Sequence, residues 1–344
     1  MGNSIVGLDI GASGIRAAEV TRTRKGTKLL RYHSLPLPGG VLQRGEVVEP
    51  QILTSALKAL WKQGRFSTNR VVLGIGNDRV IARELTVPSA PLPLIRESLP
   101  FQVQDVLPVP VADAILDFYP VAEAEHGQVQ GLLVAAVKEG VLATIEAVHK
   151  AKLEAVTVDF IPFALSRALL PPVPADEAIA VVDVGAHTTT VVIVHAGVPQ
   201  FVRIIPTGGD EVTHTLHARL DIERAVAEDA KRSLGLGVHE IAPHDQPAVD
   251  TIREVTGELV TGVRNTVTYF AASRPELPVR RAVLTGDGAS LGGFPGALAE
   301  VLRMPVDAGN AFAPLAVRER DRARTAADAH RAVVAVGLAM RSAA

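Results

Sequence analysis

The sequence predicts an α/β protein with two related lobes, the first of which carries a small inserted α+β subdomain. The segments IVGLDIGASGIRAAEV, residues 5–20, and AVVDVGAHTTTVVIV, residues 180–194, repeat one pattern. In each, a β-branched apolar run reaches an aspartate, turns on a glycine and small polar residues, and resumes as a second apolar run, which is typical of a β-hairpin. A proline-punctuated stretch from Pro88 onward separates a third, smaller unit from the first of these hairpins.

The bulk composition excludes several classes of protein. The chain has 344 residues, enough for two or three domains, and is 47% hydrophobic and 21% charged, so it can bury large cores. Its apolar runs are strand-sized, and no signal segment precedes the first strand. A net charge of −2 gives no basic field for nucleic acid, and the absence of cysteine excludes disulfides and thiolate sites. We expect a cytoplasmic protein with no nucleic-acid partner and no direct membrane insertion.

The first lobe is expected to begin with three strands and one helix. Proline opens this helix, Leu53, Leu57 and Leu60 form its apolar stripe, and a glycine follows its end. The predicted elements are strands Ile5–Ile10, Ile15–Thr21 and Lys28–Leu35, the helix Pro50–Gln63, and strands Val71–Ile75 and Val80–Val87.

The inserted subdomain is predicted from its prolines and from short apolar runs. Its elements are a helix from about Leu94, strands Ala114–Val121 and Gly131–Val137, the amphipathic helix Val141–Ala151, and a strand Ala155–Phe160. We therefore assign residues 1–87 to the first lobe, 88–157 to the subdomain, 158–177 to the return to the first lobe with a proline-rich linker, and 178–344 to the second lobe.

The second lobe repeats the opening of the first. Its predicted elements are strands Ile179–Asp183, Thr190–His195 and Phe201–Pro206, helices Asp210–Leu220, Glu223–Leu234 and Val249–Arg274, strand Ala282–Leu284, and helices Gly296–Arg303 and Asp328–Arg341. The last helix is expected to pack back toward the first lobe.

The Asp-x-Gly turns at Asp9 and Asp183 have a physical use. Glycine allows a tight turn that brings backbone N–H groups close to an anion, and a carboxylate there can hold hydrated magnesium against a phosphate. Each turn alone is commonly no more than a strand end, so the prediction depends on the two occurring together. They indicate two half-domains that close on one nucleoside triphosphate.

Two later segments fit the rest of a nucleotide. Glu228 and Lys231 are spaced i, i+3 on one helical face and suit ribose hydroxyls and the base, although a solvated ion pair is the commoner fate of such residues. AVLTGDGASLGGF, residues 282–294, runs from a strand through a glycine turn toward a helix, which allows close approach of backbone to the adenosine end. It lacks the spacing of a Rossmann fingerprint, and the chain has no P-loop.

These segments, with VDFIPFALSRAL and VVAVGLAMR, resemble in order the nucleotide motifs of the superfamily of actin, sugar kinases and heat-shock chaperone ATPases. Within it the chain is most similar to the PilM family, actin-like cytoplasmic proteins of type IV pilus assembly related to the division protein FtsA. The similarity spans essentially the whole chain, including EPQILTSALKAL and the stretch PFQVQDVLPVPVADAILDFYPV. The resemblance implies two actin-like, ribonuclease-H-like lobes with an SHS2-like subdomain.

The resemblance also implies the ligands and their residues. ATP and Mg2+ are the expected cofactors, and Asp9 and Asp183 are expected to lie near the metal and to contact it through water. The residues expected to bind the nucleotide are Asp9, Gly11, Ala12, Ser13, Arg16, Asp183, Gly185, Thr188, Thr189, Glu228, Lys231, Gly286, Gly288 and Ser290.

Catalysis is less clearly indicated than binding. Chaperone-type relatives carry a glutamate immediately before the proline of the first connecting motif, and here Ile161 precedes Pro162. Asp159 is the candidate for a group that positions the attacking water. ATP hydrolysis is therefore expected to be slow at most, and whether the chain is an enzyme stays open.

The expected partner is the N-terminal cytoplasmic peptide of a PilN-like inner-membrane protein, held in a groove between the first lobe and the subdomain. Pilus motor ATPases and self-association are further possible interactions. Candidate groove residues are Phe101, Val103, Leu107 and Val109, each equally well read as subdomain core. An FtsA-like division protein and a phosphotransferase of the same superfamily are the alternatives. No terminal amphipathic anchor of the FtsA kind is recognised, which favours recruitment to the membrane by a partner.

Overall fold

The computed structural model describes residues 4–170 and 177–341. Two five-stranded sheets have the same construction, each with three antiparallel strands followed by two parallel ones. The first has the order β10-β6-β1-β2-β3, with β1 (Ser4–Gly11), β2 (Gly14–Thr23), β3 (Gly26–Pro36), β6 (Arg70–Ile75) and β10 (Glu154–Phe160). The second has the order β13-β12-β11-β14-β15, with β11 (Ala178–Val184), β12 (Thr189–His195), β13 (Val198–Ile205), β14 (Val279–Thr285) and β15 (Val306–Ala308).

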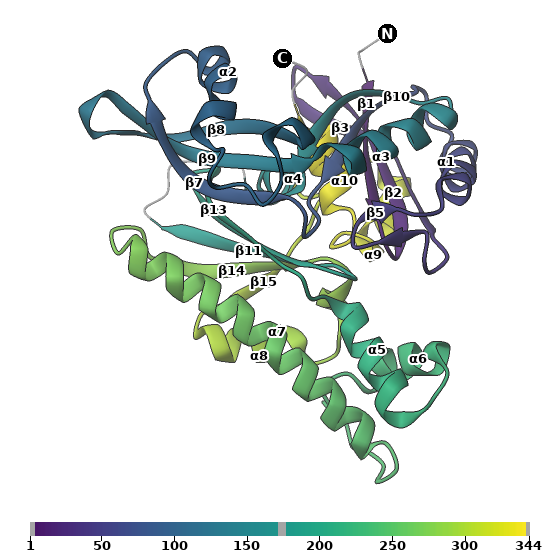
Figure 1. Ribbon diagram of the computed structural model, residues 1–344. Coiled ribbons are helices and arrows are strands. Elements are labelled where there is room, and N and C mark those ends of the chain that lie inside the picture. The colour runs from purple at the N-terminus through teal and green to yellow at the C-terminus, as the bar shows by residue number, and fades with distance from the viewer. Residues whose placement is uncertain (1–3, 171–176, 342–344) are drawn as a thin grey trace.

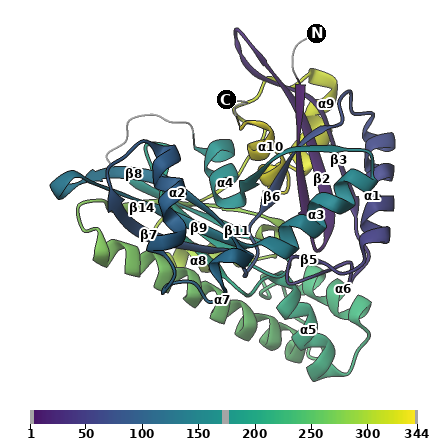
Figure 2. The same ribbon diagram turned by 45° about the horizontal axis from the view of Figure 1, so that its top comes forward.

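Helices cover these sheets and fill the space between them. Proline in the first turn opens several of them, where its missing N–H costs no hydrogen bond. The long helix α7 lies along the second sheet, whereas α4 and α10 lie between the lobes (Figures 1 and 2). The helices are α1 (Pro50–Gly64), α3 (Lys138–Lys150), α4 (Ile161–Leu169), α5 (Gly209–Leu220), α6 (Arg224–Leu234), α7 (Gln246–Ser273), α8 (Phe294–Leu302), α9 (Glu319–Ala327) and α10 (Val333–Ala339).

A third sheet, β7-β9-β8, forms the small subdomain with helix α2 (Leu92–Gln102). Its strands are β7 (Ile81–Pro88), β8 (Ala114–Ala124) and β9 (Gln128–Val137). One face packs Phe118 and Leu133 against α2, and the other joins the core shared by the lobes through Leu132 and Val134. The subdomain also reaches the second lobe, where Glu84 pairs with Arg274 at 3.2 Å.

Sheet pairing differs from the expected boundaries at 88 and 157. Strand β7 pairs with β9 and belongs to the subdomain sheet, although the sequence placed it in the first lobe. Strand β10 pairs with β6 in the first lobe, and α3 packs Ala147 and Val148 into the core beneath α1. The reason is that strand partners far apart in sequence leave no local signal. Most of the linker expected within 158–177 after α4 lies outside the described residues.

The closing segment ends in α10, which packs against α4, β1 and β2 of the first lobe. Close contact is possible because glycine occupies both surfaces: a Cβ at Gly7 or Gly337 would overlap backbone atoms of the opposing element. Helix α9 and the short strands β4 (Leu42–Gln43), β5 (Glu46–Val47) and β15 carry no sequence prediction above. Among the helices of the described ranges, none combines the length and apolar character needed to cross a bilayer.

Candidate nucleotide site

The first Asp-x-Gly turn connects β1 and β2 at the floor of the cleft between the lobes. Register pairs Asp9 with Arg16 across the hairpin, which brings the Arg16 guanidinium to 3.5 Å from the Asp9 carboxylate. The Ser13 hydroxyl donates a hydrogen bond of 2.6 Å to Asp287 on the opposite lobe. Hydroxyl and guanidinium donors thus point from this turn into the cleft.

The second turn connects β11 and β12 in the same way. The Gly185 N–H donates to the Thr188 carbonyl at 2.9 Å, and the carbonyl oxygens of Gly185 and Ala186 accept from the first N–H groups of α5. A Cβ at Gly208 would lie 2.5 Å from both of these carbonyl oxygens, so glycine is required for the close approach. The loop is therefore fixed against the N-terminus of α5.

Two carboxylates, those of Asp9 and Asp183, lie at these turns and line one cavity. Burial raises the pKa of Asp183 to about 7, and the charges of Asp9 and Asp287 add to the shift. Burial also raises the pKa of Asp9, against the opposing effect of Arg16. The pKa of Arg16 is raised because its carboxylate neighbours outweigh its own burial. The arrangement favours a cation between the two aspartates.

The glycine turn after β14 supplies the third wall. Gly286 has a φ of +88°, and a Cβ there would overlap the Val184 carbonyl, so this backbone lies directly on the second hairpin. Its N–H donates to the His330 carbonyl at 3.1 Å. Ser290 lies 2.8 Å from the His330 ring. The turn thus joins the second hairpin to the segment that leads into α10.

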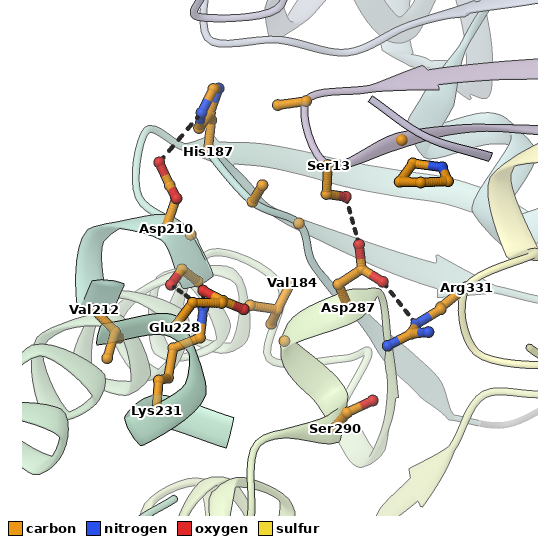
Figure 3. Close-up of a pocket in the computed structure, with 18 of the residues that line it drawn as sticks. Ser13, Val184, His187, Asp210, Val212, Glu228, Lys231, Asp287, Ser290 and Arg331 are labelled. Carbon is orange, nitrogen blue, oxygen red and sulfur yellow. Dashed lines mark hydrogen bonds and ion pairs between the residues drawn. The ribbon is translucent and has the colours of Figure 1, made fainter. Parts of the chain in front are cut away.

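Glu228 and Lys231 form the ion pair that their spacing allows, at 2.6 Å. Thr213 of α5 donates to Glu228 at 2.6 Å and accepts from Lys231 at 2.8 Å. Burial alone would raise the pKa of Glu228, but the hydrogen bonds from Lys231 and Thr213 outweigh it and lower the pKa. Both side chains nevertheless line the cleft (Figure 3), so the pairing orients them within it.

The cleft contains two neighbouring cavities that share Ser13, Arg16 and Asp287. The larger has a volume of about 1100 Å³, and its inner wall is formed by Val212, Leu259 and Phe294. The smaller, of about 170 Å³, contains Asp9 and Asp183 and extends to the junction of β9 with α3. A large compartment lined by both apolar and charged side chains thus adjoins a small one that contains the Asp9 and Asp183 carboxylates.

Most of the predicted binding residues line one or both cavities. The larger is lined by Ala12, Ser13, Arg16, Gly185, Glu228, Lys231, Gly288 and Ser290, and the smaller by Asp9, Gly11, Ala12, Ser13, Arg16, Asp183, Gly185, Thr188 and Gly286. Thr189 lines neither; it is fully buried and donates to the Thr207 carbonyl at 2.8 Å.

Asp159, the candidate for positioning water, also lines neither cavity. Its carboxylate is buried in ion pairs with Arg167 and with Arg341, the latter at 3.1 Å. These pairs tie β10 to α4 and to the end of the chain after α10. Ile161, by contrast, lines the smaller cavity.

The structure adds residues that sequence reasoning did not assign. Asp287 pairs with Arg16 at 2.7 Å and with Arg331 at 2.8 Å, and Figure 3 shows it between Ser13 and Arg331. The hydroxyl of Thr256, a buried residue of α7 that lines the larger cavity, has no hydrogen-bond partner. Asp287 lies within the glycine motif and offered a signal, whereas no local pattern marks Arg331 or Thr256.

His187, in the turn between β11 and β12, is partly buried and lies 3.5 Å from Asp210 at the first turn of α5. Arg224 pairs with the same carboxylate at 2.5 Å. The hydrogen bond with His187, and then Arg224, lower the pKa of Asp210 to about 2 against its partial burial. These side chains close one end of the larger cavity.

The four candidate groove residues do not form one surface. Val103 is fully buried in the subdomain core and Leu107 packs against it, while Phe101 is 80% exposed. Val109 is half-buried in the loop before β8. Val103, which follows α2, is therefore a residue of the subdomain core, which was the alternative reading of its apolar side chain.

Comparison with known proteins places the fold. The profile described as Type IV pilus assembly protein PilM matches residues 7–343. A solved PilM–PilN type IV pilus biogenesis complex contains a chain that is 29% identical, with a TM-score of 0.85 and 98% of both chains covered. MreB5 of Spiroplasma citri bound to ADP has a TM-score of 0.54 at 11% identity over 97% of this chain and 94% of its own, which shows the actin-like fold.

Curated relatives are more distant. The cell division protein FtsA of Bacillus subtilis is 23% identical over 279 residues, which is 73% of this chain and 61% of FtsA. FtsA of Streptococcus pneumoniae is 25% identical over 263 residues, 75% of this chain and 52% of FtsA. The chain thus spans less than two-thirds of the length of these relatives. With the family profile covering nearly all of it, the chain belongs to the PilM family of type IV pilus assembly proteins.

Proposed function

We propose that this chain binds ATP with Mg2+ between its lobes and, in that state, holds the N-terminal cytoplasmic peptide of a PilN-like inner-membrane protein. The observation that carries the proposal is the convergence of both Asp-x-Gly turns and the glycine turn on the two joined cavities. The peptide would recruit the chain to the inner face of the cytoplasmic membrane, where it acts as a scaffold of pilus assembly.

The residues present fit a nucleotide. The larger cavity is apolar at one end, where Val212 and Leu259 can pack on a base, and the unpaired Thr256 hydroxyl offers that base a hydrogen bond. Glu228 accepts hydrogen bonds and suits ribose hydroxyls. At the other end, Ser13 and Arg16 supply donors for phosphate oxygens. The compartments therefore match the order base, ribose, phosphates.

Mg2+ fits the carboxylates of the smaller cavity. Magnesium is usually held by one or two carboxylates, waters and substrate phosphates rather than by an all-protein cage. Asp9 and Asp183 supply such carboxylates, and among the described residues no group of three histidine or acidic side chains is arranged for a metal. When bound, the ion would neutralise phosphate charge.

A scaffold role agrees better with this site than rapid turnover. General base catalysis needs a side chain within hydrogen-bond reach of the attacking water. The position before Pro162 is occupied by Ile161, whose hydrocarbon side chain lines the smaller cavity and cannot orient water. Asp159 is engaged by two arginines. Bound nucleotide would thus hold the two lobes in one arrangement, because it is not rapidly hydrolysed.

The peptide groove is proposed at the outer part of the smaller cavity, between the first lobe and the subdomain. Asn77 in the loop between β6 and β7, Glu46 of β5, and Gly140 and Thr144 of α3 line this part. Because the same cavity reaches Asp9 and Asp183, nucleotide and peptide would share its walls. If the peptide binds the nucleotide-bound protein more tightly than the nucleotide-free protein, the binding of peptide and nucleotide is coupled. The solved PilM–PilN relative supports a PilN-like partner.

The test is a calorimetric titration of the chain with the N-terminal peptide of a PilN-like protein, with and without ATP–Mg2+. We expect saturable binding that Asp9→Ala and Asp183→Ala weaken, whereas Asp307→Ala, an exposed change outside both cavities, leaves it unchanged. Thr144→Arg should block the peptide, and Phe101→Ala should not. If the protein binds ATP but the peptide does not bind it, the proposed partner is wrong. If the protein does not bind ATP, the proposed nucleotide site is wrong.

A further inference from the structure

Asp287 holds an unusual position for an acidic residue in a site expected to receive phosphates. Its Oδ2 accepts from the Ser13 hydroxyl at 2.6 Å and from Arg16 Nη2 at 2.7 Å, and its Oδ1 pairs with Arg331 Nε at 2.8 Å. The carboxylate lines both cavities and so lies where they meet (Figure 3). A single carboxylate thus binds both the Ser13 hydroxyl and the Arg16 guanidinium of the first Asp-x-Gly hairpin.

These donors are the ones a phosphate group would use. Hydroxyl and guanidinium groups bind carboxylate and phosphate oxygens by the same charge-assisted hydrogen bonds. Burial alone would raise the pKa of Asp287, but Arg16 first, with Ser13 and Arg331, outweighs it, so the pKa is lowered and the carboxylate is charged at neutral pH. Its charge would repel a phosphate at the same donors.

The contacts also join turns that belong to opposite lobes. Asp287 follows β14 of the second lobe, whereas Ser13 and Arg16 belong to the first hairpin. Arg331 lies two residues before α10, which packs on β1 and α4. Asp287 therefore fastens the glycine turn of the second lobe to the first lobe across the cleft.

We propose that the Asp287 carboxylate is an internal anion that occupies the phosphate donors in the nucleotide-free protein and clasps the lobes until a nucleotide displaces it. The inference rests on the proposed function, because it assumes that the cleft takes a nucleotide. It predicts that this chain binds ATP more weakly than its donor set alone would allow. It also predicts that the nucleotide-free lobes are held together by a contact that ATP replaces.

The experiment measures nucleotide affinity and the clasp separately. Wild type, Asp287→Asn and Asp287→Ala are titrated calorimetrically with ATP, ADP and adenosine, with and without Mg2+. Asp307→Asn removes a comparable charge from the same lobe at an exposed pair with Arg281 and is the control. Hydrogen exchange of the nucleotide-free proteins at residues 11–16 and 286–291 reports on the clasp, and circular dichroism confirms that each variant is folded.

The internal anion predicts that Asp287→Ala binds ATP and ADP about tenfold more tightly, a change of ~1.4 kcal/mol. The ATP affinity of Asp287→Asn should lie between those of wild type and Asp287→Ala. Adenosine affinity should be unchanged because adenosine has no phosphate. Exchange at both segments should be faster in Asp287→Ala without nucleotide.

Equal or weaker ATP binding by both folded variants, with wild type binding normally, would overturn the inference and leave the proposed function intact. Such weakening would mean that Asp287 supports the phosphates or the metal instead. Absence of ATP binding by wild type and variants alike would overturn both.

Discussion

A single substitution at Gly337 would disturb the close contact between α10 and α4. In Gly337→Ala, the new Cβ would overlap the Ala164 carbonyl oxygen and lie 2.5 Å from its carbonyl carbon and 2.9 Å from its Cα. These are backbone atoms, so no change of rotamer relieves the overlap. Carbon atoms separate to about 3.5–4.0 Å at their optimum, so α10 must retreat by roughly 1 Å.

The magnitude follows from two opposing effects. Alanine in a helix is favoured over glycine by ~1 kcal/mol. Forcing extra volume into a well-packed core costs about 1–3 kcal/mol, and more where backbone must move. Because α10 is buried along its whole length, its retreat also loosens Val336 and Leu338 in the core between the lobes. We expect a net loss of about 2 kcal/mol of unfolding free energy for Gly337→Ala.

The assay is thermal unfolding of the nucleotide-free protein, with Gly257→Ala as the matched control. Gly257 is exposed within helix α7, and a Cβ there meets no atom within 4 Å. This control should gain ~0.5–1 kcal/mol from helix propensity and unfold slightly above wild type. For a chain of this size, 2 kcal/mol corresponds to a lowering of the midpoint by about 3 °C.

The two glycine variants should therefore shift in opposite directions. If Gly337→Ala unfolds at or above the wild-type midpoint while Gly257→Ala behaves as expected, α10 is not pressed against α4 as described. The argument that glycine permits this contact would then be wrong.

Three further predictions concern the cleft and its surroundings. Thr256→Val should weaken ATP binding about fivefold through loss of a hydrogen bond of ~1 kcal/mol, and should leave the unfolding free energy unchanged or slightly raised, since a buried unpaired hydroxyl is removed. The control is Thr251→Val: the Thr251 hydroxyl already bonds to its own helix, so ATP affinity should not change. Equal ATP affinities in wild type and both variants would contradict the contact with the base. Asp159→Asn should lower stability by about 2 kcal/mol because two partly buried arginines lose their carboxylate. It should leave the proposed ATP affinity and any ATP hydrolysis unchanged, so a selective loss of hydrolysis would restore Asp159 as a catalytic candidate. The lowered pKa of Asp210 supplies stability that is present above its unfolded pKa of 3.8 and is lost as pH falls through about 2. Asp210→Asn should therefore cost about 1 kcal/mol of unfolding free energy at pH 7, after allowance for solvent screening. A denaturation series in which this loss does not shrink between pH 5 and pH 2 would refute the assignment.

Local sequence predicted much of this fold because its signals are local. A β-branched run, Asp-x-Gly and a second apolar run specify a hairpin within about twenty residues, and both hairpins have the predicted order of strand, turn and strand. Proline at a helix start and an apolar stripe likewise act within a few turns, as in α1. The repetition of the hairpin was enough to predict two lobes of the same construction.

Contacts between distant segments had to come from the tertiary structure. The phosphate-type turns and the glycine motif were recognisable one by one, but only folding shows that Asp287 meets Ser13 and Arg16 on the opposite lobe. Asp159 was read as a catalytic candidate because nothing nearby in sequence reveals its ion pair with Arg341.

By itself, then, the sequence determined the two hairpin-based lobes, the glycine positions of the turns and the family. The tertiary structure decided which sheet β7 joins, which carboxylates face the cleft and which are neutralised elsewhere. The physical reason is that strand pairing, desolvation and ion pairing depend on residues brought together by the whole chain. A side chain's neighbours in sequence fix its local conformation, whereas its neighbours in space fix its charge and its role.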